Sequence, residues 1–491
     1  MAFEKGGENA YDVVIIGAGI SGINFGYRLQ ERNPDLSYII LDGRHEMGGT
    51  WSLFQYPGIR SDSDLYTFGF PWRPWTEETS IAGGPLILNY LKESAQMYGI
   101  DKKILFHHQV NAANYSSEHK TWSFDVTANK TEKKTFRSKF VLLCTGYYDY
   151  HEPLKTVIPG IDDFKGKVIH PQFWPKDLDY ANKNVVIVGS GATSVTVVPA
   201  MSRTASHVTM LQRSPSYILS TPSEDALERF IRRWFPVYYQ HKLIRWKWIA
   251  VPFLLVTFCQ YFPSLGKKMF RSATEPQLPP TVSYSPNFTP DYNPFEQRVC
   301  FCPDADFYRA LRSGKASVET GVIEKVTADS VKLTSGKELH PDIIVTATGL
   351  KVRVGGGIDV SVDGKPYNVP EKYVWKGVML QDLPNAAFVI GYVDASWTLG
   401  ADATAQMICR MLNQMKKEGV DEIIPRLSDK EKNTMKDAPL LRLKSTYVKK
   451  GKDVLPKAAD RGQWQARSYY WKDYLLAHYG DIKSSIEWNR S

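Results

Sequence analysis

The sequence is poor in cysteine. Its 491 residues include five cysteines at irregular spacings, with no C-x-x-C pair among them. An odd number without a regular framework argues against stabilisation by disulfides. The missing C-x-x-C also excludes the dithiol–flavin reductase mechanism and a zinc site, so no metal is expected. The cysteines are Cys144, Cys259, Cys300, Cys302 and Cys409.

A long uninterrupted apolar run is also missing. Residues 1–10 are polar and contain no apolar signal-peptide core, which predicts a cytoplasmic protein. The apolar stretch at residues 248–258 is too short to span a bilayer, and we expect Pro252 to interrupt it. Two interpretations stay open: a helix that covers a substrate tunnel, which we favour, or peripheral membrane contact through the basic and apolar residues 241–271.

Charge of one sign is not in large excess. The net charge of +9 is modest for this length, with no long basic run and no nucleic-acid-binding motif. We therefore expect no nucleic-acid partner, and the slight basic bias suits anionic cofactors. The length alone predicts about three domains.

The sequence does contain two glycine-rich turns, each after a β-branched run typical of a buried parallel strand. In the first, residues 11–16 precede Gly17, Gly19 and Gly22. The helix that follows offers free N–H groups and a positive dipole end to a pyrophosphate. Asp42 ends the next strand, 20 residues beyond Gly22. A carboxylate there accepts hydrogen bonds from an unmodified ribose and repels a 2′-phosphate, which fits FAD or NAD.

The second turn has a different continuation. Gly189 and Gly191 are followed by Thr193 and Ser194, so serine replaces the third glycine. The next strand lacks an acid at its end, and Arg213 stands 19 residues beyond Ser194. A guanidinium binds a 2′-phosphate by paired hydrogen bonds, although an ordinary surface arginine would also fit this place. The second turn therefore predicts NADPH and the first, by elimination, FAD.

The predicted fold is α/β, with two Rossmann-like dinucleotide-binding domains and a mainly helical insertion. Strands that end in Thr145-Gly146 and Thr348-Gly349 mark passages between the two domains. The predicted boundaries are 1–150 for the first part of the FAD-binding domain, 151–221 for the first part of the NADPH-binding domain, 222–296 for the insertion, 297–350 for the second part of the NADPH-binding domain, and 351–491 for the second part of the FAD-binding domain with the C-terminal tail.

A longer pattern lies between the two turns. Residues 164–175 fit F-x-G-x-x-x-H-x-x-x-W-P. This pattern resembles, in composition and place, the fingerprint of the Baeyer–Villiger monooxygenases, the class B flavoprotein monooxygenases. Stretches from about residue 11 to about residue 415 resemble the branch that includes the mycobacterial ethionamide-activating monooxygenase, with Ser61 as a branch marker where many members have cysteine. The fingerprint residues are Phe164, Gly166, His170, Trp174 and Pro175.

The resemblance implies a reaction. NADPH reduces bound FAD, the flavin captures O₂ as a C4a-peroxide, and one oxygen atom is inserted beside the carbonyl of a small apolar ketone. The product is an ester or lactone, and sulfides or thioamides are oxidised at sulfur. Arg298 matches the active-site arginine of the family, and Asp62 matches the carboxylate that positions it. A fixed cation suits a site where negative charge develops in a dry environment.

The resemblance also assigns binding residues. Without the resemblance, the serine and aspartate residues around Asp62 would suggest that Asp62 caps the N-terminus of a helix. The cofactor residues implied are Gly49, Thr50, Trp51, Asp62, Thr348 and Gly349, and the substrate-pocket residues are Ser396, Trp397 and Thr398.

Three alternatives stay open at this point. The first is a flavin N- or S-monooxygenase without ketone activity. The second is a non-oxygenating NADPH-dependent flavin reductase, and the third is a flavin-binding redox sensor without turnover. NADPH consumption with and without a ketone, together with the peroxide released, separates them.

Overall fold

The first glycine-rich turn lies in a nine-stranded sheet. The computed structural model describes residues 9–392, 395–441 and 446–490. In the sheet, β1 (Ala10–Ile16) runs parallel to β2 (Tyr38–Leu41) on one side and to β6 (Glu132–Leu143) on the other. The other strands are β3 (Ile104–Leu105), β4 (His108–Ser116), β5 (Thr121–Ala128), β17 (Asp359–Val362), β18 (Lys365–Pro366) and β21 (Ala386–Phe388). The order is β18-β17-β4-β5-β6-β1-β2-β3, and β21 also pairs with β6.

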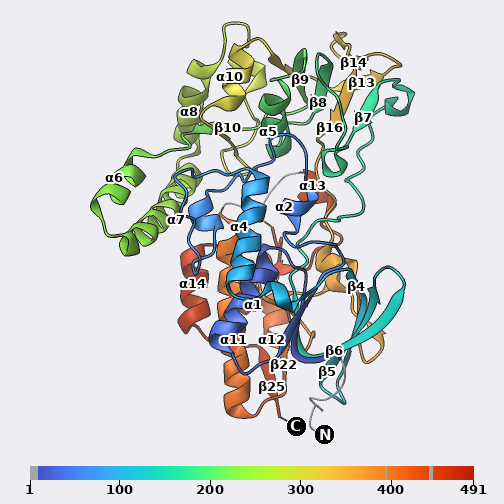
Figure 1. Cartoon of the computed structure of the whole chain (residues 1–491), viewed down its shortest axis with the longest axis vertical. Coiled ribbons are helices and arrows are strands. Elements are labelled where there is room, and N and C mark those ends of the chain that lie inside the picture. Colours follow the sequence, from blue (N-terminus) through green and yellow to red (C-terminus); the bar gives the residue numbers. More distant parts are fainter. Residues whose placement is uncertain (1–8, 393–394, 442–445, 491) are drawn as a thin grey trace.

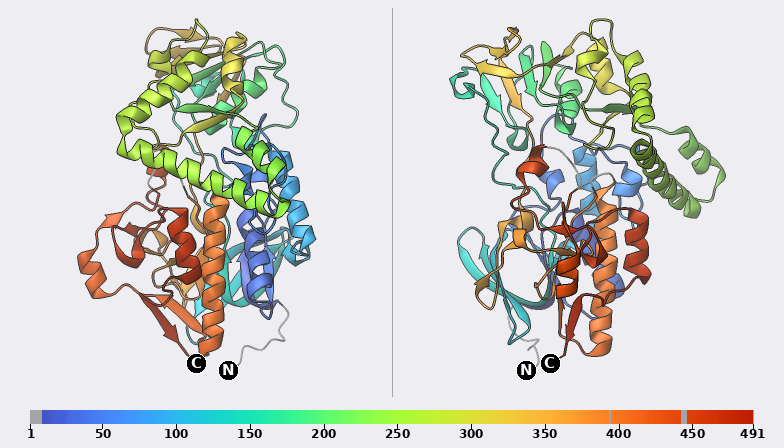
Figure 2. Two further views of the ribbon diagram at one scale, coloured as in Figure 1. Left: turned by 90° about the vertical axis from the view of Figure 1, so that its left-hand side faces the viewer. Right: turned by 180° about the vertical axis from the view of Figure 1, so that it is seen from behind.

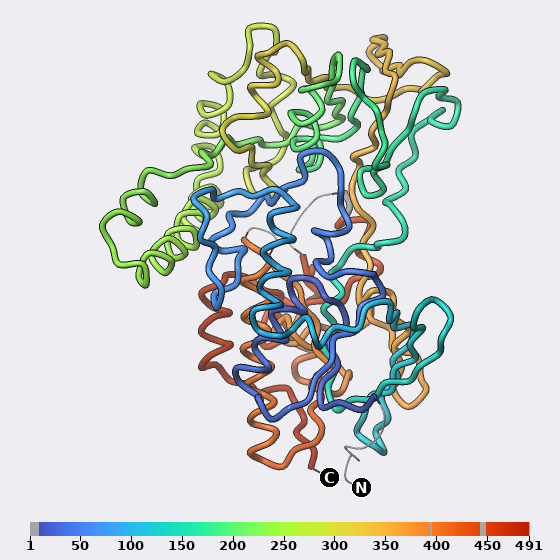
Figure 3. Tube along the Cα trace, in the orientation of Figure 1, coloured from blue at the N-terminus to red at the C-terminus, as the bar shows by residue number. Residues whose placement is uncertain are grey.

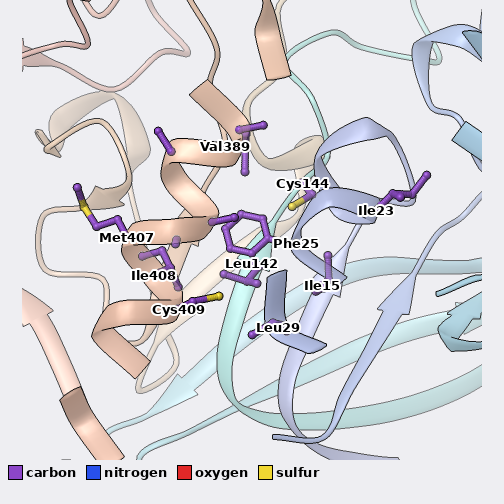
Figure 4. Close-up of a cluster of buried hydrophobic side chains, with 14 of the residues drawn as sticks. Ile15, Ile23, Phe25, Leu29, Leu142, Cys144, Val389, Met407, Ile408 and Cys409 are labelled. Carbon is purple, nitrogen blue, oxygen red and sulfur yellow. The ribbon is translucent and has the colours of Figure 1, made fainter. Parts of the chain in front are cut away.

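Two helices from distant parts of the chain join on this sheet. α1 (Ile20–Arg32) packs beside α11 (Trp397–Glu418), so the C-terminal region completes the domain that the N-terminal region begins (Figure 3). Phe25 of α1 points into a buried cluster with Leu142 and Ile408 (Figure 4). The buried Arg28 adds a charged link, because its Nε donates to Oδ1 of Asp402 on α11 at 2.7 Å.

The second glycine-rich turn lies in a separate five-stranded parallel sheet. Its strands are β7 (Lys167–Ile169), β8 (Asn184–Val188), β9 (His207–Gln212), β12 (Ala316–Thr320) and β16 (Ile343–Thr346), in the order β12-β9-β8-β16-β7. α5 (Ala192–Met201) and α10 (Asp306–Arg312) pack together in this lobe, which forms the upper part of Figure 1. The predicted class, α/β with two Rossmann-like domains and a helical insertion, is confirmed.

The helical segment leaves and re-enters the second lobe through two short parallel strands, β10 (Ile218–Thr221) and β11 (Cys300–Pro303). Between them lie α6 (Ala226–Trp234), α7 (Val237–Tyr261) and α8 (Pro263–Thr274). The expectation that Pro252 interrupts the apolar stretch is wrong, because α7 runs through it for 25 residues. Polar and aromatic residues on both sides extend the helix. Among the described residues, α7 is the one helix long and apolar enough to cross a membrane by length and composition.

Shorter elements complete the described chain. All five cysteines are buried free thiols. The remaining helices are α2 (Thr50–Leu53), α3 (Leu65–Phe68), α4 (Gly84–Met97), α9 (Tyr284–Asn287), α12 (Asp429–Thr434), α13 (Thr446–Lys450) and α14 (Tyr470–Tyr479), and the remaining strands are β13 (Ile323–Val326), β14 (Val331–Leu333), β15 (Glu338–Leu339), β19 (Val374–Trp375), β20 (Met379–Leu380), β22 (Glu422–Pro425), β23 (Asp437–Ala438), β24 (Ala458–Ala459) and β25 (Ile486–Asn489).

Candidate active site

The turn between β1 and α1 is closely packed. Gly17 has φ of +106°, which disfavours any other residue. A Cβ on Gly22 would lie 1.9 Å from the carbonyl oxygen of Gly17, so the helix can approach the turn only with glycine there. Gly19 caps α1 and lines a large cavity. The first turn therefore has the shape that a pyrophosphate requires, with a helix N-terminus directed at the cavity.

Asp42 lies beneath this turn. Its Oδ2 accepts from the backbone N–H of Ala18 at 2.7 Å, and its Oδ1 accepts from the N–H of Arg44 at 2.8 Å. Burial raises the pKa of Asp42, while these two hydrogen bonds oppose the shift. The carboxylate therefore fixes the turn, and Asp42 is not among the cavity-lining residues, unlike Gly19. Its role toward a ribose stays a prediction.

The loop after β2 meets the same turn. Gly49 has φ of +55°, and a Cβ there would lie 3.2 Å from the Cα of Gly19. Gly49, Thr50 and Trp51 all line the cavity. The indole of Trp51 packs edge-on against Phe68 at 5.5 Å between ring centroids. This close approach of two backbone segments brings the two predicted parts of the first cofactor site together.

The turn between β8 and α5 leaves more room for a ligand. A Cβ on Gly189 would lie 2.3 Å from the carbonyl oxygen of Ala347, whereas a Cβ on Gly191 would have no neighbour within 4 Å. Gly191 caps α5, and Gly191 and Thr193 line the cavity. Ser194, which replaces the third glycine, is fully buried and does not line it. The open space at the helix N-terminus fits a second pyrophosphate.

The two glycines of this turn give a matched pair of variants. We expect Gly191→Ala to fold normally but to raise the KM for NADPH by about tenfold, a loss of about 1.4 kcal/mol, because its methyl group would enter the ligand space. Gly189→Ala should instead lower the melting temperature, since it combines a positive φ with a backbone clash. Melting curves and NADPH titrations of both variants check this. An unchanged KM in Gly191→Ala would mean that no dinucleotide approaches this turn.

Arg213 lies at the end of β9 and lines the cavity with its side chain exposed. No carboxylate within the described ranges is paired with its guanidinium. Lys449 and Lys450 of α13 line the same cavity and are also exposed. The sequence analysis assigned nothing to these lysines, which lie 236 and 237 residues beyond Arg213 in the chain. No local pattern could have found them, because only the fold brings the tail to this place.

The fingerprint residues divide by role. His170 lines the cavity, while Phe164, Gly166, Trp174 and Pro175 do not. Phe164 is buried, and a Cβ on Gly166 would lie 2.4 Å from the carbonyl oxygen of Asp342 and 2.5 Å from the Phe164 ring. Trp174 packs against the core of the second lobe. Most of the fingerprint therefore shapes the fold around β7, and His170 is its contribution to the cavity.

His170 is held next to one of the passages between the lobes. Its Nδ1 accepts from the N–H of Gln172 at 3.2 Å, which leaves the proton of the neutral ring on Nε2. Burial lowers the pKa of His170, and the backbone of Gly349 opposes the shift. Thr348 and Gly349 line the cavity as well. The imidazole is thus neutral near pH 7 and placed where the chain crosses between the lobes.

Arg298 and Asp62 meet in the cavity wall. Arg298 Nη1 lies 3.9 Å from Asp62 Oδ2, with 44% of the arginine side chain exposed. Arg60, two residues before Asp62, forms an ion pair with Asp306 in which both side chains are mostly buried. Asp306 thus holds Arg60, and Arg298 presents its charge to the cavity. Asp62 is not a helix cap, because Asp64 caps α3 by accepting from the N–H of Thr67.

Asp62 should control the acid side of the pH profile. Burial raises the pKa of Asp62, while Arg298 and then Arg60 oppose the shift. A raised pKa means that the carboxylate is lost at a higher pH than an exposed aspartate would lose it. We expect kcat/KM to fall as the pH is lowered and Asp62 takes up its proton. This fall, the acid limb of the pH profile, should be absent in Asp62→Asn. Initial rates across pH measure it.

A stability measurement provides the control for this variant. Because the folded state binds the proton of Asp62 more readily than the unfolded state, this group lowers stability as pH rises through the interval between the two pKa values. Asp62→Asn should therefore melt no lower than the unmodified protein at neutral pH. A lower melting temperature, or an unchanged acid limb, would contradict the positioning role.

The predicted substrate residues do not all reach the cavity. Trp397 lines it, stacks on Tyr147 at 5.2 Å between ring centroids, and donates from Nε1 to Ser21 Oγ at 2.9 Å. Ser396 and Thr398 point away from it and hold the loop to α3, through Thr67 Oγ1 at 2.6 Å and the carbonyl oxygen of Phe68 at 2.5 Å. Asp394, two residues before Ser396, lies outside the described residues.

One cavity of about 880 Å³ unites these parts. It runs along the N-terminal turns of both α1 and α5 and includes Arg298, Asp62 and His170 in its wall. Two dinucleotides bound at the two turns would therefore share one space. Among the described residues, no group of three or more His, Cys, Asp or Glu side chains is arranged to hold a metal ion.

Known proteins resemble this chain closely. Residues 83–231 match the flavin-binding monooxygenase-like family, and residues 15–77 match the NAD(P)-binding Rossmann-like domain. The FAD-containing monooxygenase EthA of Mycobacterium tuberculosis is 44% identical over 472 residues, which cover 96% of both chains. The probable FAD-binding monooxygenase AlmA of Acinetobacter baylyi is 44% identical over 467 residues, covering 95% of this chain and 93% of AlmA.

Solved structures share the fold at lower identity. Cyclohexanone monooxygenase from Rhodococcus sp. Phi1, bound to NADP⁺, superimposes with a TM-score of 0.75 at 18% identity and covers 99% of this chain and 100% of that one. A steroid monooxygenase bound to NADP gives a TM-score of 0.73, also at 18% identity, over 98% of this chain and 100% of that one. The identity to EthA and AlmA over nearly the full length confirms the family expected from the motifs, and the chain belongs to the FAD-containing monooxygenases.

Proposed function

We propose that this enzyme uses NADPH, FAD and O₂ to insert one oxygen atom beside the carbonyl of an apolar ketone, and that it also oxidises sulfides or thioamides. One NADPH and one O₂ are consumed per ester or lactone, and the second oxygen atom leaves as water. The observation that carries this proposal is the single cavity that joins both glycine-rich turns and has the Arg298–Asp62 pair in its wall.

The chain's own residues account for binding and charge. The turns at Gly17–Gly22 and Gly189–Ser194 would hold the two pyrophosphates, and Arg213 would bind the 2′-phosphate of NADPH. When bound, NADPH would supply the two electrons and FAD would pass them to O₂. Arg298 provides a fixed positive charge where negative charge develops on the oxygen atoms of the reacting ketone, and Asp62 keeps the guanidinium in place. Trp397, Tyr147 and Trp51 line the cavity with aromatic surface that excludes water.

The relatives support this proposal without fixing the substrate. Cyclohexanone monooxygenase and steroid monooxygenase have the same fold, and both were solved with NADP. The match to the flavin-binding monooxygenase-like family over residues 83–231 fits both this proposal and the alternative of oxygenation at nitrogen or sulfur without ketone activity.

A single set of assays tests the proposal. NADPH, O₂, ester and hydrogen peroxide are measured with linear, cyclic and aromatic ketones, with sulfides and thioamides, and without substrate. We expect about one ester per NADPH with a preferred ketone. Sulfoxide formation without any ester would support the alternative, and peroxide as the sole product with every substrate would contradict oxygenation.

A further inference from the structure

The net charge of the chain is concentrated in one segment. Residues 229–274 contain no aspartate or glutamate, whereas the chain as a whole has 61 lysines and arginines against 52 acids. The rest of the chain is consequently balanced at 52 of each sign, and this segment accounts for the whole net charge of +9. Lys247 is paired with Asp225 and Glu228, and Arg271 with Glu275, so an anionic partner would be attracted to the other basic residues of this segment. Its basic residues are Arg229, Arg232, Arg233, Lys242, Arg245, Lys247, Lys267, Lys268 and Arg271.

The same segment exposes most of the apolar surface. Of the 27 large apolar side chains that are exposed in the described part of the chain, 14 lie within residues 229–274. On α7, Trp246 is 56% exposed, Leu254 62% and Tyr261 76%. Only 17% of the most apolar window of this helix is buried. A contiguous exposed surface of this kind needs an apolar partner. We call the side chains of α6, α7 and α8 up to Lys268 that are not buried the α6–α7 face.

The other side of α7 is fixed to the protein. Lys247 Nζ and Trp248 Nε1 both donate to Oε1 of the buried Glu228, at 2.9 and 2.6 Å. Arg245 donates to the carbonyl oxygens of Tyr66 and Gly69 at 2.6 and 3.0 Å. In the left-hand view of Figure 2, α7 crosses the face of the molecule that is turned toward the viewer. To cross a bilayer, α7 would have to break these contacts and bury unpaired charges in lipid, so a surface-bound helix is favoured.

We propose that the α6–α7 face binds the surface of a bilayer that contains anionic lipids. Its tryptophans and tyrosines suit the boundary between headgroups and acyl chains, and lysines and arginines extend toward the headgroups from an apolar surface. Each basic residue near an anionic surface adds to the attraction. A second copy of this chain is a poor occupant, because a twofold contact would place two such basic segments against each other.

The position of the α6–α7 face offers a route for substrate entry, an inference that rests on the proposed function. A second cavity of about 300 Å³ is lined by Cys259, Gln260 and Pro263, at the junction of α7 and α8. Tyr392 lines both this cavity and the large one. An apolar substrate dissolved in the bilayer would thus have a short path from the α6–α7 face to the active site.

Vesicle sedimentation of the FAD-loaded enzyme tests the proposal. We expect binding to vesicles of phosphatidylcholine with phosphatidylglycerol, weak binding to phosphatidylcholine alone, and release as salt rises from about 0.05 to about 0.5 M, where screening becomes strong. Trp246→Ser/Leu254→Ser and Lys267→Gln/Lys268→Gln should each bind about tenfold more weakly. The matched controls, Leu86→Ser/Met97→Ser and Lys102→Gln/Lys103→Gln, remove equally exposed side chains elsewhere and should bind normally.

The outcomes against the proposal are distinct. No binding of the unmodified enzyme to anionic vesicles, or an equal loss in the control variants, would overturn it. Light scattering that shows an oligomer broken by Trp246→Ser/Leu254→Ser would assign the face to a protein contact instead. Protein that resists alkaline carbonate would indicate a spanning helix. The FAD absorbance and the turnover of a water-soluble ketone without vesicles show that the variants are folded, and failure of that turnover in the unmodified enzyme would contradict the proposed function alone.

Discussion

Arg298→Ala should reduce ester formation from a ketone by about 10²- to 10³-fold in kcat while FAD stays bound. This is the loss observed when one preorganised donor to a developing anion is removed. The Arg298 guanidinium lines the cavity and lies 3.9 Å from the Asp62 carboxylate, whereas the charge of Arg60 in the same wall is paired with Asp306. Product analysis under saturating NADPH, together with the flavin spectrum, measures both parts of the expectation.

Two variants control for loss of charge alone. Arg309→Ala removes an exposed arginine on α10 that does not line the cavity, and it should leave kcat unchanged. Arg298→Lys keeps a charge but not the planar fork, so it should recover only part of the rate. Slower reduction of the flavin in Arg298→Ala would not contradict the role of Arg298 in ketone oxygenation. Ester formation at a near-normal rate in Arg298→Ala would remove Arg298 from the catalytic site.

The glycine-rich turns could be predicted because their signals are local. Gly22 is required by a contact within the same turn, because its Cβ would lie 1.9 Å from the carbonyl oxygen of Gly17, and Gly17 is favoured by its φ of +106°. A predicted strand, a glycine-rich turn and a predicted helix in this order are enough to locate a pyrophosphate-binding turn. The same holds for Gly189, where a buried strand and positive φ explain the residue.

The pairing of Arg298 with Asp62 could not be predicted from local chemistry. The two residues are 236 positions apart, and the proline-rich surroundings of Arg298 would suggest an ordinary surface arginine. Only the resemblance to a family brought them together. Arg60 and Asp306 are similarly far apart in the sequence, and no sequence pattern indicates that they pair. Their ion pair is what distinguishes Arg60 from Arg298.

Other parts of the site depend on which side of a segment faces the cavity. The segment 396–398 was assigned as a whole, yet only Trp397 lines the cavity, because hydrogen bonds from Ser396 and Thr398 hold the loop to α3. Asp42 ends its strand at the expected spacing, but one of its oxygens accepts from Ala18 of the turn and the other from Arg44 of its own loop. The exposure of α7 was also beyond the sequence, since an apolar run looks the same whether it is buried or faces outward.

Arg213→Ala should raise the KM for NADPH by about one to two orders of magnitude and leave the KM for NADH nearly unchanged. A charge-assisted hydrogen bond to the 2′-phosphate contributes about 1.5–3 kcal/mol, and tenfold in affinity corresponds to about 1.4 kcal/mol. NADH has no such phosphate and gains nothing from the guanidinium. The exposed position of Arg213 in the cavity wall, at the end of β9, is where the sequence spacing expects the adenosine ribose.

Two comparisons identify the group responsible for this preference. Arg203→Ala removes an exposed arginine of the same lobe that does not line the cavity, and it should leave the ratio of kcat/KM for NADPH and NADH intact. Lys449→Gln/Lys450→Gln removes two further exposed cations that line the same cavity. If the preference for NADPH survives in Arg213→Ala but is lost in the lysine variant, the 2′-phosphate is bound by α13. In that case the arginine at the end of β9 is only a surface residue.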